Sequence, residues 1–164
     1  MSKVVYKIGD DVSTDIIYPG RFMATVLPTE TPQFAFADDK EFNTKLNNKE
    51  IPAGSFIVAN DNFGCGSSRE QAASCLKGWE VTIVAKHIAR IFLQNSINLG
   101  LNVVICPDIE AEMGDDLEVA GDVLKNNTSG KEFKIVPLAP AQQSIINAGG
   151  LIAFTRTRLL ADKA

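Results

Sequence analysis

Three short segments that are apolar except for one residue each mark the middle of the chain, at residues 55–59, 81–85 and 102–106. Such nearly continuous apolar segments are typical of strands that are buried on both faces. Two segments with helical signals lie between them, residues 69–79 and 87–100, and each carries a glycine at its end. This alternation predicts a parallel α/β core with right-handed crossovers.

The amino-terminal part of the chain is less regular. Residues 4–8 predict a strand, and residues 38–46 predict a short helix with an acidic first turn. Residues 16–36 contain three prolines and keep neither a helical nor a strand period. Because a long loop without secondary structure of its own is often functional, we expect a binding loop there.

The last third of the chain has a different pattern. Residues 117–126 form two β-like runs around Gly121 and Asp122, which is a hairpin signal. Residues 131–138 predict a further strand, and residues 140–150 a helix with proline at its start and glycine at its end. We therefore expect α/β units followed by a β-rich C-terminal half, arranged as a mixed barrel or a layered α/β domain.

Length and charge narrow the class of protein. A chain of 164 residues predicts one domain, residues 1–164, since domains average roughly 150 residues. The net charge of -4 argues against nucleic acid as a partner. No apolar run approaches the roughly 20 residues that cross a membrane, and residues 1–11 lack the pattern of a secretory signal. The expected location is the cytoplasm.

Metal-binding and catalytic side chains are scarce. Cys65, Cys75 and Cys106 form no CxxC pair, so their spacing predicts neither a zinc site nor an iron–sulfur cluster in this chain. His87 is the single histidine and lies between a predicted strand and a predicted helix, where a structural or capping role is favoured over catalysis. Any chemistry must use few residues or depend on a partner.

The segment NDNFGCGSSRE, residues 60–70, is the best candidate for a site. It follows a predicted buried strand and precedes a helix, where α/β sheets bind ligands. Ser67 with Glu70, or Ser68 with Gln71, fits a capping box, and a helix amino terminus attracts anions. Arg69 in the first turn opposes the helix dipole, which suggests a carboxylate or phosphate ligand. The alternative is a capped helix with a surface arginine.

This segment and several others in the chain resemble the sequence motifs of a known family. Residues 62–70, 84–86, 89–92 and 95–100, together with 9–17 and Pro19, resemble the small subunit of isopropylmalate dehydratase. That subunit is the swivelling domain of the aconitase superfamily. The resemblance is strong over residues 4–110 and looser beyond them. It implies a swivelling β/β/α domain with a mixed sheet or barrel and flanking helices.

The resemblance also implies a reaction and a partner. The expected partner is a large subunit with a [4Fe-4S] cluster, which acts as a Lewis acid when a substituted malate loses water. The substrate implied is 2-isopropylmalate, isomerised to 3-isopropylmalate in leucine biosynthesis. By resemblance, Ser67 is the base that removes or returns a proton, and Ser68 and Arg69 bind a substrate carboxylate.

One loop departs from the family pattern. Phe22, Met23, Ala24 and Thr25 occupy the stretch that chooses the substrate in this family, and Ala24 stands where an arginine is frequent. An apolar loop suits an alkyl-substituted malate, while dimethylmalate, methylmalate and homoaconitate types stay open. Arg21 either reaches the substrate or is a surface residue. We expect Phe22, Phe34 and Phe36 to pack over the substrate or against the partner.

Two other classes of protein remain as alternatives. A free-standing carboxylate sensor would use the same helix terminus and would bind its ligand without a partner. The other is a swivelling domain that belongs to an iron-free dehydratase. The iron content of the native complex would distinguish it from a subunit of an iron–sulfur dehydratase.

Overall fold

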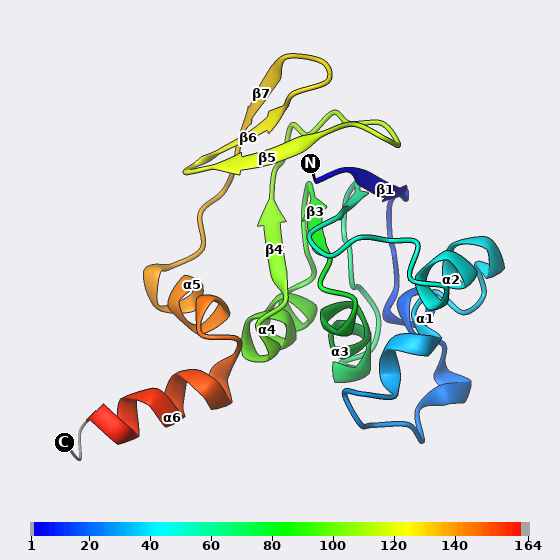
Figure 1. Ribbon diagram of the computed structural model, residues 1–164, viewed down its shortest axis with the longest axis vertical. Helices are drawn as coiled ribbons and strands as arrows, with labels where there is room; N and C mark the ends of the chain where they lie inside the picture. The colour runs from blue at the N-terminus through cyan, green and yellow to red at the C-terminus, as the bar shows by residue number, and fades with distance from the viewer. Residues whose placement is uncertain (1, 162–164) are drawn as a thin grey trace.

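The computed structural model describes residues 2–161, and its centre is a four-stranded parallel sheet (Figure 1). The strands are β1 (Val4–Lys7), β2 (Phe56–Ala59), β3 (Thr82–Ala85) and β4 (Asn102–Ile105), in the order β1-β2-β3-β4. Ile57 pairs with Ile83, which pairs with Val103, so the predicted apolar runs lie in register. The predicted parallel core is confirmed.

Helices α3 (Glu70–Gly78) and α4 (Arg90–Leu99) connect these strands and cover one face of the sheet. On that face Ile57 and Ile83 pack in one cluster with Leu76 of α3 and Phe92 of α4. α4 begins at Arg90, later than the predicted position 87, because Ile88 pairs with Phe63 in a parallel bridge.

A second sheet covers the other face. It contains β5 (Leu117–Ala120), β6 (Val123–Asn126) and β7 (Lys131–Lys134), all antiparallel. Val58 and Val84, which alternate with the helix-facing residues, pack in a cluster with Leu124 and Phe133 of this sheet. The predicted hairpin is confirmed, with Gly121 and Asp122 at its turn. Helices, parallel sheet and antiparallel sheet form three layers, which is the β/β/α arrangement expected.

The C-terminal half contains more helix than predicted. α5 (Pro140–Asn147) was expected, but α6 (Leu151–Ala161) was not. Gly100 and Gly150 allow α4 to meet the segment before α6, because a Cβ on Gly100 would lie 2.5 Å from the Gly149 carbonyl carbon. No helix among residues 2–161 is both long enough and apolar enough to cross a membrane.

The predicted loop at residues 16–36 is folded into short turns. It contains α1 (Thr14–Ile17) and the 3₁₀ turns η1 (Gly20–Phe22) and η2 (Thr31–Phe34), and α2 (Lys40–Asn47) follows it. Its aromatic rings pack on one another and on the core: Phe22 stacks on Phe34 at 4.2 Å with both half-buried, and Phe36 is buried. Phe36 is therefore a core residue and does not cover a ligand, whereas for the half-buried Phe22 and Phe34 a contact with substrate or partner stays a prediction.

Candidate active site

Three loops meet at the carboxyl ends of β1, β2 and β3. Ser13 pairs with Cys65, and Phe63 pairs with Ile88, so the loops continue the parallel sheet for a few residues beyond its strands. The Thr14 amide donates to the Cys65 carbonyl at 2.8 Å. The segment that the sequence singled out is therefore held on both sides by neighbouring backbone.

Two glycines shape the loop that carries Ser67, which we call the serine loop (residues 64–69). Gly64 has φ +78°, and a Cβ there would lie 2.2 Å from Cγ of Phe92 on α4. Gly66 has φ +91°, a conformation that side-chain-bearing residues rarely adopt. The first glycine lets the loop lie directly on α4, and the second turns the chain toward Ser67.

Ser67 contacts a hydroxyl group that lies 53 positions earlier in the chain. Thr14 Oγ1 lies 3.1 Å from Ser67 Oγ and 3.3 Å from the Ser67 carbonyl oxygen. Thr14 is 2% exposed, whereas Ser67 is exposed. A buried hydroxyl on a short helix thus fixes an exposed one, an arrangement suited to orienting Ser67 toward a ligand.

The start of α3 differs from the predicted capping box. Its N-cap is Arg69, and no side chain caps the helix, so Arg69 precedes the first turn instead of lying in it. The serines are held elsewhere: Ser67 contacts Thr14, and the Ser68 carbonyl accepts a hydrogen bond from Asn95 Nδ2 at 3.3 Å. The capping prediction is wrong, and the first backbone N–H groups of α3 have no side-chain cap, which leaves them available to an anion.

Arg69 is held in an ion pair. Its Nη1 donates to the Asp15 carboxylate and to the Tyr18 carbonyl, and its side chain is 16% exposed. The Gly20 amide also donates to Asp15 Oδ1, at 2.9 Å. The hydrogen bond from Arg69, and then that from Gly20, hold the pKa of Asp15 below its usual range. Asp15 thereby fixes one nitrogen of the guanidinium, and Nη2 and Nε retain further donors.

Among the described residues, Arg21 has no hydrogen bond or ion pair with the serine loop. Its guanidinium forms a fork with the Asp38 carboxylate, with the shorter contact at 2.5 Å, and lies 4.6 Å from the centre of the Phe22 ring. Of the two roles left open for Arg21, the surface ion pair agrees with this geometry. Met23 and Ala24 are exposed, and the Met23 carbonyl accepts a bond from Gln71 Nε2 at 3.4 Å, which ties the loop to the first turn of α3.

The other candidate groups take structural positions. His87 is exposed and contacts the Asp61 carboxylate, and it caps no helix because the N-cap of α4 is Ala89. Cys75 is fully buried, and burial raises the pKa of its thiol far above the usual range. Among residues 2–161, no group of three or more His, Cys, Asp or Glu side chains is placed to hold a metal ion.

The site residues that the sequence reasoning missed are Thr14, Asp15 and Asn95. The first two belong to the motif at residues 9–17, which had been noted for its resemblance and not for contacts with the serine loop. Together with Ser67, Ser68 and Arg69, they form an open surface with an oriented hydroxyl, an arginine and a helix amino terminus. Such a surface can bind a carboxylate and exchange one proton with a neighbouring carbon.

Comparison with known families shows to which family the chain that carries this surface belongs. The model of the aconitase C-terminal domain family matches residues 11–106. The match includes all six of these site residues and more than half of the chain. The chain therefore belongs to the aconitase C-terminal domain family.

Its relatives within the family are small subunits of malate-type dehydratases. One is the 3-isopropylmalate dehydratase small subunit of Caldicellulosiruptor bescii, 42% identical over 96% of this chain and 95% of the relative. Another is the 2,3-dimethylmalate dehydratase small subunit of Eubacterium barkeri, 42% identical over 92% of this chain and 93% of the relative. The crystal structure of 3-isopropylmalate dehydratase from Methanocaldococcus jannaschii matches with a TM-score of 0.88 and 35% identity, over 98% of this chain and 96% of that one. The resemblance and the fold predicted from the sequence are confirmed.

Proposed function

We propose that this chain is the small subunit of a hydro-lyase that interconverts 2-isopropylmalate and 3-isopropylmalate in leucine biosynthesis. The observation that carries the proposal is the Ser67 hydroxyl, oriented by Thr14 at 3.1 Å and placed two residues before Arg69 at the start of α3. The near-full-length similarity to 3-isopropylmalate dehydratase small subunits supports the choice of reaction.

The chain's own residues account for binding and proton transfer. Arg69 and the amino terminus of α3 bind a carboxylate of the substrate, with Ser68 beside them. Ser67 Oγ takes the proton from the carbon next to the one that loses its hydroxyl, and returns a proton when water adds back. When Ser67 is deprotonated, the Thr14 hydroxyl hydrogen turns from the Ser67 carbonyl to Ser67 Oγ and stabilises it, because a donor favours the charged form of its acceptor.

An iron–sulfur cluster does not fit the residues of this chain. Cys75 and Cys106 are buried and Cys65 is half-buried, in three separate segments of the chain, and the described residues contain no group of three or more metal-ligating side chains. We therefore place the [4Fe-4S] cluster on a large partner subunit. The exposure of Ser67 and Ser68 supports such a partner, because closing an active site expels water and strengthens the electrostatic interactions inside it.

The apolar loop at Phe22–Thr25 supports an alkyl-substituted malate as substrate. Met23 is 46% exposed and Ala24 carries no charge, so this stretch offers no cation to a third carboxylate. A second candidate substrate, 2,3-dimethylmalate, is favoured by the similarity to the Eubacterium barkeri subunit.

The test is reconstitution of the complex without oxygen. The chain is combined with the large subunit encoded in the same genome, and the complex is assayed with 2-isopropylmalate, 2,3-dimethylmalate, methylmalate and homoaconitate. We expect turnover to be highest with 2-isopropylmalate. Turnover of dimethylmalate alone would select the second candidate, and a complex that turns over none of them would contradict the proposal.

Calorimetry on the isolated chain separates this function from a carboxylate sensor. If half of the site lies on a partner, 3-isopropylmalate should bind the chain alone with a Kd weaker than about 1 mM, which corresponds to roughly 4 kcal/mol of binding free energy. Micromolar binding by the isolated chain would favour the sensor instead.

A further inference from the structure

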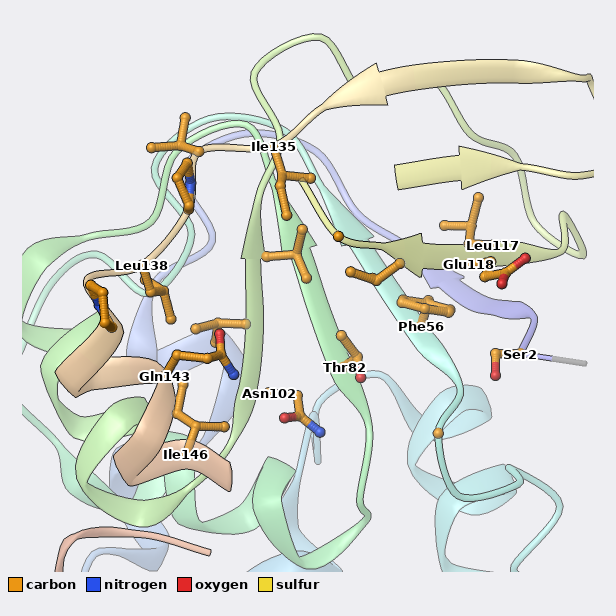
Figure 2. A pocket seen from close by; sticks show the side chains of 18 residues that line it. Ser2, Phe56, Thr82, Asn102, Leu117, Glu118, Ile135, Leu138, Gln143 and Ile146 are labelled. Atoms are coloured by element: carbon orange, nitrogen blue, oxygen red, sulfur yellow. The ribbon is translucent and has the colours of Figure 1, made fainter. Parts of the chain in front are cut away.

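A second concave surface lies away from the serine loop. A cavity of about 710 Å³ opens between the two sheets beside α5, and none of the proposed site residues lines it (Figure 2). Its wall is mostly apolar, with Phe56, Ile135, Leu138 and Ile146 among the contributors. Among its described lining residues, Glu118 is the one charged side chain. The cavity is therefore unsuited to malates and suited to an apolar group that carries a cation.

One segment of the chain beside this cavity carries no charged side chain. Residues 135–155 contain no Asp, Glu, Lys or Arg, although 22% of the whole chain is charged. The segment forms one wall of the cavity, all of α5 and the first half of α6. Exposed residues of α5 such as Gln143 and Asn147 are polar but uncharged. Depletion of charge on an exposed surface is typical of the core of a protein interface.

α6 exposes apolar side chains along its whole length. None of its residues is buried, and Ile152, Leu159 and Leu160 are 78%, 57% and 64% exposed. With Leu151 they line one side of the helix, together with Arg156. Figure 1 shows that α6 projects from the body and is attached at its amino-terminal end. Because an isolated helix of this length is only marginally stable in water, its apolar side needs a partner.

We propose that a second copy of this chain is that partner, with α6 of each copy seated in the cavity of the other. α5 lies between α6 and the second sheet on the same side of the molecule (Figure 1). A two-fold axis near α5 therefore brings α6 of one copy to the other copy's cavity and the reverse, as a closed dimer requires. Arg156 then meets Glu118, and the apolar side of α6 meets the apolar wall.

Direct pairing of α6 with its own copy is disfavoured by charge. Arg156 lies in the middle of the apolar side, so an antiparallel pair would place two arginines together, and residues 151–161 contain no acid to separate them. An 11-residue helix is also only about 16 Å long, too short for a stable interface without the cavity and α5. The proposal concerns assembly and does not depend on the reaction proposed above.

The first test is the mass of the isolated chain in solution. Light scattering after gel filtration should give twice the 17.7 kDa of one chain. The double variant Ile152→Gln with Leu159→Gln should weaken the dimer by about tenfold or more, since it removes buried apolar surface. Met113→Gln changes a similarly exposed apolar residue outside the cavity and α6, and should leave the dimer unchanged.

A charge exchange tests the contact itself. Arg156→Glu and Glu118→Arg should each weaken the dimer, and the two together should restore it. Arg158→Glu is the matched control, because Arg158 lies 5.7 Å from the Phe154 ring and outside the apolar side. Circular dichroism checks that the exposed substitutions leave each variant folded.

The proposal is overturned if the chain is a monomer at every concentration tested, or if these variants do not weaken the dimer. It is also overturned if the double charge variant forms a dimer no more stable than those of the single variants. Variants that keep the dimer but lose the large subunit would show instead that α6 docks on that subunit. Loss of malate turnover in an unchanged dimer would count against the proposed function and not against this interface.

Discussion

At the scale of single residues, the arginine of the serine loop is only partly committed to the fold. Asp15 and the Tyr18 carbonyl hold Nη1 of Arg69, which leaves the remaining donors for a ligand. Lysine at this position can keep the ion pair with Asp15 but has no second planar donor group.

Arg69→Lys should therefore raise KM by roughly 10- to 100-fold, the value of one charge-assisted hydrogen bond, while the assembled complex persists. Steady-state kinetics of the reconstituted enzyme measure this. Arg21→Lys is the control and should leave KM near its wild-type value, because Arg21 is paired with Asp38 at the surface. An unchanged KM in Arg69→Lys would remove Arg69 from the substrate site.

Gly64→Ala should destabilise the protein more than Gly114→Ala. Both glycines have a positive φ, +78° and +89°, so both substitutions impose backbone strain. Only at Gly64 does the new Cβ meet the Phe92 ring, while Gly114 faces open space. Denaturant unfolding should show a difference of about 1–3 kcal/mol between the two variants, the usual effect of overpacking. Equal losses would mean that the serine loop is not held against α4.

At the scale of elements, the stability of α2 depends on the residue that caps its amino terminus. Asp39 is the N-cap, where its carboxylate accepts the Phe42 amide at 3.0 Å and the Tyr6 hydroxyl at 2.7 Å. These two hydrogen bonds, the first above all, hold the pKa of Asp39 below its ordinary value. Burial and the same carboxylate raise the pKa of Tyr6.

Asp39→Ala should lower the free energy of unfolding by about 1 kcal/mol at neutral pH, as loss of an N-cap does. The folded-state pKa of Asp39 is depressed, so its contribution is present above the unfolded pKa and is lost as pH falls through the folded one. The difference between wild type and Asp39→Ala should shrink below about pH 4. Asp39→Asn retains a capping oxygen and should lose less. A difference independent of pH would show that the carboxylate charge is not involved.

Elements governed by local pattern were predictable, and those set by distant contacts were not. The apolar runs of β2, β3 and β4 and the Gly121–Asp122 turn appear where the sequence placed them. The start of α4 depends on pairing between Phe63 and Ile88, which no local pattern records. α6 was missed because it buries none of its residues, so its sequence shows no apolar face of the kind that packs on a core.

At the scale of the whole molecule, the three layers present the serine loop at one edge of the parallel sheet. The sequence identified Ser67, Ser68 and Arg69 through their glycine-rich context. It did not pair Ser67 with Thr14 or Arg69 with Asp15, because 53 and 54 positions separate them and only the fold brings them together. We propose that this edge carries the proton-transfer hydroxyl of Ser67 and the anion site at Arg69, and that a partner supplies the rest of the catalyst.

The role of Ser67 as the proton-transfer group is tested most directly by kcat of the reconstituted complex with Ser67→Ala in place of the wild-type chain. Loss of a proton-transfer group should lower kcat by about 10²- to 10⁴-fold, with the mass of the complex unchanged. Ser68→Ala, the neighbouring exposed serine, should act mainly on KM. A Ser67→Ala complex that turns over 2-isopropylmalate at a near-wild-type rate would contradict the assignment of Ser67.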